Sequence, residues 1–266
     1  MTRMRTSSIA PRWRKVARDL WLHRARTTLV VLAIVVGLVG AGAVLDTWAL
    51  LRRVTRDEYL ATNPAAATLR VDGVDATLLQ AVRAMPEIRD AQARRTTVAA
   101  VQVDGGWASA LLFASPELAA QRVGRLVREQ GAWPPPEGAF VMEKSSLDFA
   151  GVAVGDSILV RAGDGAAVRL PIVGVARDAG LAPGWMEHVV YGFVTPATLA
   201  RLGAPSALDQ LQITVRDRAL DREGVRAVAR RVRDVAVRAG HRVREIDVPE
   251  PGRHVHAAQM DSLLMT

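Results

Sequence analysis

The chain has 266 residues, 50% of them hydrophobic and 23% charged, which is enough material for one membrane anchor and one or two well-packed domains. The net charge of +8 does not indicate a nucleic-acid-binding protein, because residues 1–26 carry eight basic residues against one acid and so hold +7 of it. The absence of cysteine excludes disulfides and thiolate chemistry, so an exterior domain would depend on its hydrophobic core.

Residues 1–26 are predicted to form a cytoplasmic basic amphipathic segment. Apolar residues recur from Pro11 onward at the spacing of a one-sided helix, which is typical of a helix that lies in the membrane surface. The alternative is a short solvated leader in which this spacing is accidental. The residues expected to face the lipid are Trp13, Val16, Leu20 and Trp21.

The next segment, residues 27–51, is predicted to be a transmembrane helix. From Leu29 to Leu45 it has seventeen residues with no charged or strongly polar side chain, and a span needs roughly 17–25 such residues. The basic segment before it should stay in the cytoplasm, which places the rest of the chain outside a plasma (inner) membrane. The alternative is a signal peptide cleaved near Ala41-Gly42-Ala43, but the basic region is long for a signal.

Small residues recur every four positions within this predicted span. Ala33, Gly37 and Ala41 would share one face of the helix, on which a second helix could approach closely. We therefore predict a helix–helix contact at these three residues, and a homodimer would also suit such a face.

Two strand–helix–strand patterns flank the middle of the exterior part. The first has a helix that begins after Asp75 and ends before Pro86, and the second has a longer helix from Asp221 to Ala239 that stops at Gly240. An additional strand follows the first pattern across the turn Asp104-Gly105-Gly106. The predicted strands are Ala67–Val71, Thr96–Val103, Trp107–Phe113, Leu211–Val215 and Val243–Val248. The fold class expected is α+β, with a split β-α-β, ferredoxin-like core.

The segment between the two patterns is predicted to be a mostly β subdomain. Its expected strands are Ala139–Met142, Ile158–Arg161 and Val168–Val175, followed by a short helix that starts at Thr195-Pro196. The predicted organisation is therefore a core domain at 52–115 and 205–258 with an insertion at 116–204.

Three stretches resemble FtsX-like ABC transporter permeases with a MacB-type extracytoplasmic core domain. They are the leader RKVARDLWLHRARTTLVVLAIVVGL, the strand entry YLATNPAAATL, and the run from Gly131 to Gly180 with its G-V-A-V-G-D turn and V-G-V-A-R-D strand end. The resemblance covers the whole chain, but its motifs are structural and carry no catalysis. In that family the chain continues into a second membrane helix, so residues 259–266 would be only the start of that helix.

The resemblance implies partners instead of a bound cofactor. It predicts a separate ABC ATPase subunit that binds the ATP, together with further membrane helices on the same or another chain. In the sequence itself no G-x-x-x-x-G-K-[ST] phosphate loop is found, which agrees with nucleotide binding elsewhere. No cofactor, metal or nucleic acid is therefore expected for this chain.

No set of residues indicates an enzyme. A G-x-S-x-G elbow is missing from the sequence, and His254 and His256 have no third metal ligand at a sensible spacing. Glu143 and Lys144 are expected on a strand, as a charged edge or exposed face. The predicted function is a permease subunit, or a fragment of one, that couples ATPase-driven motion to the exterior. The alternative is a single-pass anchored binding or scaffold module without transport.

Overall fold

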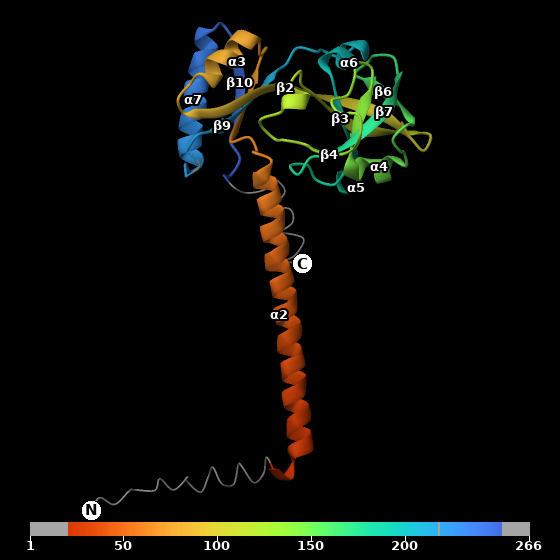
Figure 1. Cartoon of the computed structure of the whole chain (residues 1–266), viewed down its shortest axis with the longest axis vertical. Coiled ribbons are helices and arrows are strands. Elements are labelled where there is room, and N and C mark those ends of the chain that lie inside the picture. Colours follow the sequence, from red (N-terminus) through yellow and green to blue (C-terminus); the bar gives the residue numbers. More distant parts are fainter. Residues whose placement is uncertain (1–20, 218, 252–266) are drawn as a thin grey trace, which may run out of the picture. The chain divides into compact units, whose positions relative to one another are not determined.

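The computed structural model describes residues 21–217 and 219–251, in two units that meet between Thr55 and Arg56. Helix α2, Arg24–Ala61, makes up nearly all of the described part of the first unit and contributes its last six residues to the second (Figure 1). At about 1.5 Å per residue its 38 residues measure roughly 57 Å, nearly twice the thickness of a hydrocarbon core. The helix therefore continues well past the predicted span.

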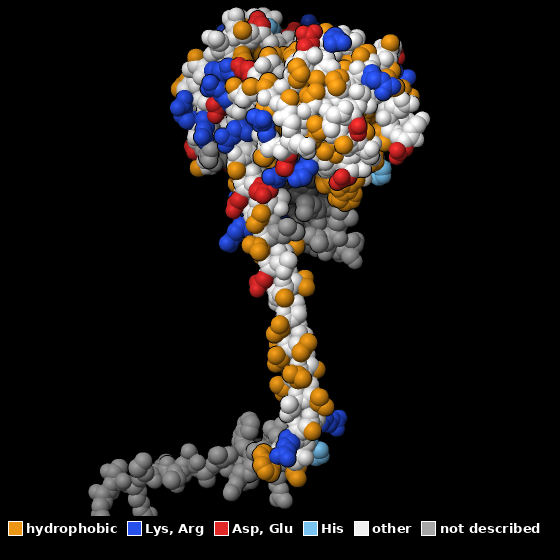
Figure 2. Space-filling model, turned by 45° about the vertical axis from the view of Figure 1, so that its right-hand side comes forward, with side chains coloured by type: hydrophobic (Ala, Val, Ile, Leu, Met, Phe, Trp, Pro, Cys, Tyr) orange, Lys and Arg blue, Asp and Glu red, His pale blue; other side chains and the backbone are white. Residues whose placement is uncertain are grey.

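Helix α2 is, among the described residues, the one helix that is long and apolar enough to cross a membrane. A signal sequence near an N-terminus shares this length and composition. Figure 2 shows hydrophobic side chains along most of its length. The segment from Arg52 onward continues the helix as far as Ala61.

The core of the second unit is a four-stranded antiparallel sheet in the order β10-β1-β9-β2. Helices α3 and α7 connect β1 to β2 and β9 to β10, which is the split β-α-β arrangement of a ferredoxin-like fold. The prediction for this core is confirmed. Its elements are β1 (Ala67–Val71), α3 (Ala76–Arg83), β2 (Ile88–Val103), β9 (Gln210–Val215), α7 (Arg222–Arg238) and β10 (Val243–Asp247).

Side-chain caps fix where the two core helices begin. The Asp75 carboxylate accepts a hydrogen bond from the Leu78 N–H at 2.7 Å, and Asp221 does the same for Gly224 at 2.8 Å. The apolar faces of both helices pack on one side of the sheet, where Leu78, Val82 and Val232 have no exposed surface. The opposite side of this sheet carries buried polar residues, among them Gln92, Gln212 and Thr214.

The remaining strands form a second lobe in which the hydrogen-bonded pairs close into a ring, β2-β3-β8-β5-β7-β6. Strands in a closed ring have few free edges. Strand β4 lies outside the ring and pairs with β7. We call this lobe the barrel. Its further elements are β3 (Gly106–Ala114), η1 (Leu118–Ala120), β4 (Val127–Gly131), β5 (Phe140–Glu143), α4 (Lys144–Ala150), β6 (Ser157–Ala162), β7 (Val168–Arg177), α5 (Gly184–Glu187), β8 (Val189–Val194) and α6 (Pro196–Arg201).

Strand β2 belongs to both lobes. It pairs with β9 as far as Arg94 and with β3 from Arg95 onward, so hydrogen bonding changes sheets in the middle of one continuous strand. The β2–β3 hairpin, which the sequence analysis assigned to the core, thus pairs within the barrel. The predicted insertion at 116–204 starts about twenty residues after this switch in pairing.

Candidate functional site: the attachment of helix α2

The last turn of α2 ends abruptly and enters the domain through Asn63. The Thr62 and Asn63 N–H groups donate to the Tyr59 and Leu60 carbonyls, both at 3.1 Å. Asn63 then takes the left-handed conformation, with φ 56°. Asparagine is among the few residues that adopt this conformation at low cost, so it suits the end of a helix.

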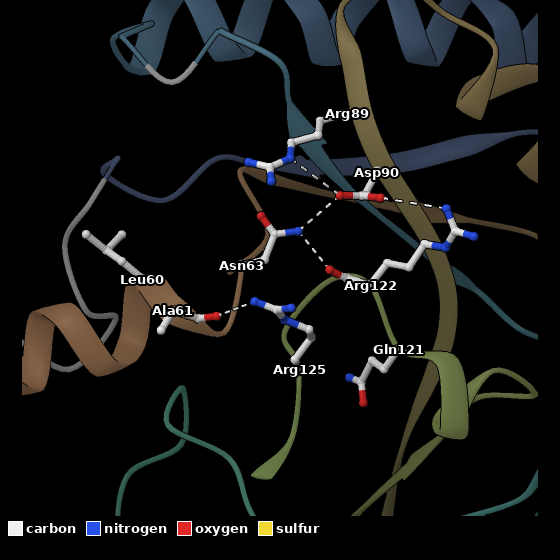
Figure 3. A pocket seen from close by; sticks show the side chains of 8 residues that line it. All are labelled: Leu60, Ala61, Asn63, Arg89, Asp90, Gln121, Arg122 and Arg125. Atoms are coloured by element: carbon white, nitrogen blue, oxygen red, sulfur yellow. Dashed lines mark hydrogen bonds and ion pairs between the residues drawn. The ribbon is translucent and has the colours of Figure 1, made fainter.

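The Asn63 side chain joins two segments that are distant in sequence. Its amide nitrogen donates to the Asp90 carboxylate at 3.3 Å and to the Arg122 carbonyl at 2.7 Å (Figure 3). Asp90 lies on β2, and Arg122 lies on the segment between η1 and β4. The helix end is therefore tied to the core sheet and to this connecting segment by one side chain.

The connecting segment also donates hydrogen bonds to the backbone at the end of the helix. The Gly124 and Arg125 N–H groups donate to the Asn63 and Thr62 carbonyls at 2.9 and 2.7 Å. The Arg125 guanidinium donates to the Ala61 carbonyl at 2.7 Å, and so satisfies one of the carbonyls that a helix leaves open at its C-terminus. We call this set of contacts the joint.

A buried glutamine on the core sheet holds the joint in place. The Gln92 side-chain oxygen accepts from the Arg122 N–H at 3.1 Å and the Val123 N–H at 3.4 Å. Gln92 is only 1% exposed, so these bonds are shielded from competing water. The connecting segment is consequently held against the polar side of the sheet.

Other residues in the last turns of α2 contact the barrel. Glu58 pairs with Arg177 at 3.0 Å, and Arg177 also pairs with Glu129 at 3.4 Å. Tyr59 is buried beside the loop after β7, where a side chain on Gly180 would lie 3.6 Å from its ring. The end of α2 therefore contacts both lobes.

The expectation of an exposed charged face is wrong for Glu143. Lys144 is exposed as expected, but it lies on a helix and not on a strand. Glu143 ends β5 and is buried, with its carboxylate accepting from the N–H and hydroxyl of Ser145, while Lys144 begins helix α4. Burial raises the pKa of the Glu143 carboxyl, as does the charge of Asp178, although the hydrogen bonds from Ser145 act in the opposite direction. The carboxylate caps α4, which explains why an acidic residue lies inside the domain.

An open cavity of about 530 Å³ adjoins the joint. Its lining is polar and basic, with three arginines and a single carboxylate. Figure 3 shows Arg89 and Arg122 on the two sides of Asp90, and Arg125 beside the helix end. The lining residues are Leu60, Ala61, Asn63, Arg89, Asp90, Gln121, Arg122 and Arg125.

The residues singled out from the sequence lie elsewhere. Trp13, Val16 and Leu20 are outside the described residues, and Trp21 is exposed with the Arg24 guanidinium 5.6 Å from its ring centroid. The face of Ala33, Gly37 and Ala41 is exposed on α2, and a Cβ on Gly37 would meet nothing within 4 Å. The surface helix and the helix contact stay predictions.

The described residues contain no group of three or more potential metal ligands, and His254 and His256 lie outside them. The partners of Asn63 were not identified from the sequence. One signal was present, because Arg122, Arg125 and Arg128 recur every three residues in the connecting segment and the start of β4. This spacing indicates a positively charged surface, although the joint uses the backbone of Arg122 and not its guanidinium.

No protein-family model and no curated protein sequence matches the chain. Among solved structures it is similar to the extracellular domain of the noncanonic ABC-type transporter YknZ from Gram-positive bacteria, with 10% identity and a TM-score of 0.44 over 67% of this chain and 100% of that one. It is also similar to the periplasmic region of MacB from Actinobacillus actinomycetemcomitans, with 10% identity and a TM-score of 0.43 over 79% and 97%. A domain of a putative permease from Porphyromonas gingivalis matches with 12% identity and a TM-score of 0.43 over 75% and 94%. A likeness at this level does not assign a function to the chain.

Proposed function

We propose that the chain is a membrane subunit of an ABC-type transport or mechanotransmission complex. Helix α2 crosses the plasma membrane with its N-terminal end in the cytoplasm, and the domain that follows lies outside. In this proposal the domain moves with α2 and carries ATPase-driven motion to the exterior. The sequence resemblance to FtsX-like permeases supports the proposal.

The observation that carries it is the continuity of α2 from the apolar stretch into the joint. An α-helix whose backbone hydrogen bonds are intact is stiff, whereas a flexible linker would absorb any displacement. The helix has no break between Arg24 and Ala61, and its end is held by Asn63, Arg125 and the Glu58–Arg177 ion pair. A device that transmits motion needs such a rigid attachment and no acid or base.

The proposal assigns ATP to a separate ATPase subunit. It also requires further membrane helices, on the same or another chain, and the small-residue face of α2 is where one of them would pack. A homodimer is one way to supply that helix.

The proposal is tested first by association. The full chain, purified in mild detergent from cross-linked membranes of its native host, should bring an ABC ATPase with it in a constant ratio. Recovery of the chain alone would contradict the transport proposal and favour the anchored binding module.

Rigidity of the attachment is tested within the second unit. Since the chain has no cysteine, spin labels at Asp57→Cys and Val98→Cys report one distance, which should have a narrow distribution in the full chain. Replacing Asn63 and Arg177 by alanine should broaden it, while the matched replacement of Arg230 and Arg238 on α7 should not. An equally broad distribution in all three proteins would rule out a rigid joint.

A further inference from the structure

We propose that the cavity beside the joint binds a phosphate-bearing anion. The inference goes beyond the proposed function. The anion site rests on the lining of the cavity alone, and only the source of the anion is argued from the predicted membrane span. It applies equally to a transport subunit and to an anchored binding module.

The lining carries an excess of positive charge. Arg89, Arg122 and Arg125 contribute three guanidinium groups, and Asp90 is the one carboxylate among the residues that line the cavity. The Arg89 and Arg122 guanidinium groups both pair with the Asp90 carboxylate. An anion in the cavity would therefore meet a net charge of about +2 from its walls.

The ion pairs that Asp90 makes are long. Its two oxygens lie 3.8 Å from the Arg89 Nε and 4.0 Å from the Arg122 Nη1, beyond the reach of a hydrogen bond. The Asp90 oxygen nearer Arg89 also accepts from the Asn63 amide at 3.3 Å. Asp90 consequently leaves most guanidinium donors of both arginines available.

Arginine geometry suits an oxyanion such as phosphate. Each guanidinium presents five N–H donors in a planar fork that matches two phosphate oxygens, and Arg125 uses one of its donors for the Ala61 carbonyl. Arg89 is on β2 and Arg125 on the connecting segment, and Figure 3 shows their guanidinium groups on either side of Asn63. A phosphate that bound to both arginines would link the two segments that hold the end of α2.

The length of α2 bears on the source of the phosphate. Leu60, which lines the cavity, follows the last residue of the predicted span by nine residues, or roughly 14 Å along the helix. The headgroup region of one leaflet is only about 5–8 Å thick. For an upright helix, this distance favours a free phosphate or a phosphate on an exterior molecule over a lipid headgroup.

The first arm of the test uses inorganic phosphate and pyrophosphate. The full chain in phosphatidylcholine nanodiscs is titrated at constant ionic strength against chloride, and the thermal unfolding midpoint is recorded. Both anions should raise the midpoint in a saturable way. The variant Arg89→Gln/Arg122→Gln should bind about tenfold more weakly, since charge-assisted hydrogen bonds are lost.

A matched control and a second arm complete the test. Arg230→Gln/Arg238→Gln removes the same charge from α7 and should bind phosphate within about twofold of the wild type. Nanodiscs that contain phosphatidylglycerol, without added phosphate, should stabilise the wild type over the cavity variant only if a lipid headgroup is the source. The inference is overturned if the cavity variant responds like the control in both arms, or if neither phosphate nor phosphatidylglycerol stabilises the wild type.

Discussion

Asn63 combines two properties that no other residue type supplies together at the end of α2. Its backbone is left-handed, which costs most side chains about 1–2 kcal/mol, and its amide reaches both Asp90 and the Arg122 carbonyl. Aspartate would tolerate the backbone but repel Asp90. Glycine would tolerate it too, without making either hydrogen bond.

Two replacements of Asn63 distinguish the contribution of its left-handed backbone from that of its side-chain hydrogen bonds. Asn63→Ala should lower the free energy of unfolding by about 2–4 kcal/mol, because it loses both hydrogen bonds and strains the backbone. Asn63→Gly loses the hydrogen bonds alone, so its loss should be about 1 kcal/mol smaller. Denaturant unfolding of the full chain in detergent measures both, and equal losses would contradict a role for the left-handed backbone.

Glu143 gives a prediction about pH. Because its pKa is raised in the folded protein, its contribution to stability is fully present below the ordinary glutamate pKa and is lost as the pH rises through the raised value. Unfolding between pH 4 and 8 should therefore show the wild type losing stability relative to Glu143→Gln as the pH increases. The surface variant Glu245→Gln should keep the wild-type pH dependence, and parallel profiles for wild type and Glu143→Gln would contradict the prediction.

At the scale of elements, the strands and helices with strong local signals could be predicted. The caps at Asp75 and Asp221 are enough to locate the two helices of the ferredoxin-like core, and the turn at Asp104-Gly105 locates the β2–β3 hairpin of the barrel. Strand β4 could not be found in this way, because its five residues are all exposed and show no apolar alternation. Helix α4 is only seven residues long and depends on the buried Glu143 for its start.

The joint could be predicted in part only. The C-terminal end of α2 could not be located from the sequence, because Arg52–Ala61 contains neither glycine nor proline. The partners of Asn63 lie 27 and 59 residues further on, and periodicity carries no information about such distant contacts. The extent of α2 and its attachment required the tertiary structure.

Helix α2 carries the prediction about association. If the small-residue face is a helix contact, Gly37→Ile combined with Ala41→Ile should weaken association in bilayers, because the larger side chains keep two backbones apart. Val39→Ile on the opposite side of the helix should leave association unchanged. Energy transfer between labelled chains in vesicles measures the difference, and unchanged association of the double variant would remove the predicted contact.

For the whole molecule, the orientation proposed for the membrane gives a direct experiment. With no native cysteine, single cysteines at Ser7 and at the exposed Val98 can be labelled without background. A membrane-impermeant maleimide should label Val98→Cys in intact cells and Ser7→Cys only after permeabilisation. The reverse pattern would contradict the orientation, and a mature N-terminus near position 44 by mass spectrometry would indicate a cleaved signal peptide.

The strand common to both lobes limits how the domain can be dissected. Deleting residues 116–204 as a cassette would keep the hairpin from Arg95 to Ala114 but remove its neighbours β6 and β8, so two unpaired strand edges would invite aggregation. A clean exchange of the barrel with another domain would have to cut inside β2, after Arg94, and rejoin the chain just before β9 at Gln210. Domain grafting on this protein therefore has its natural splice point within a strand and not in a loop.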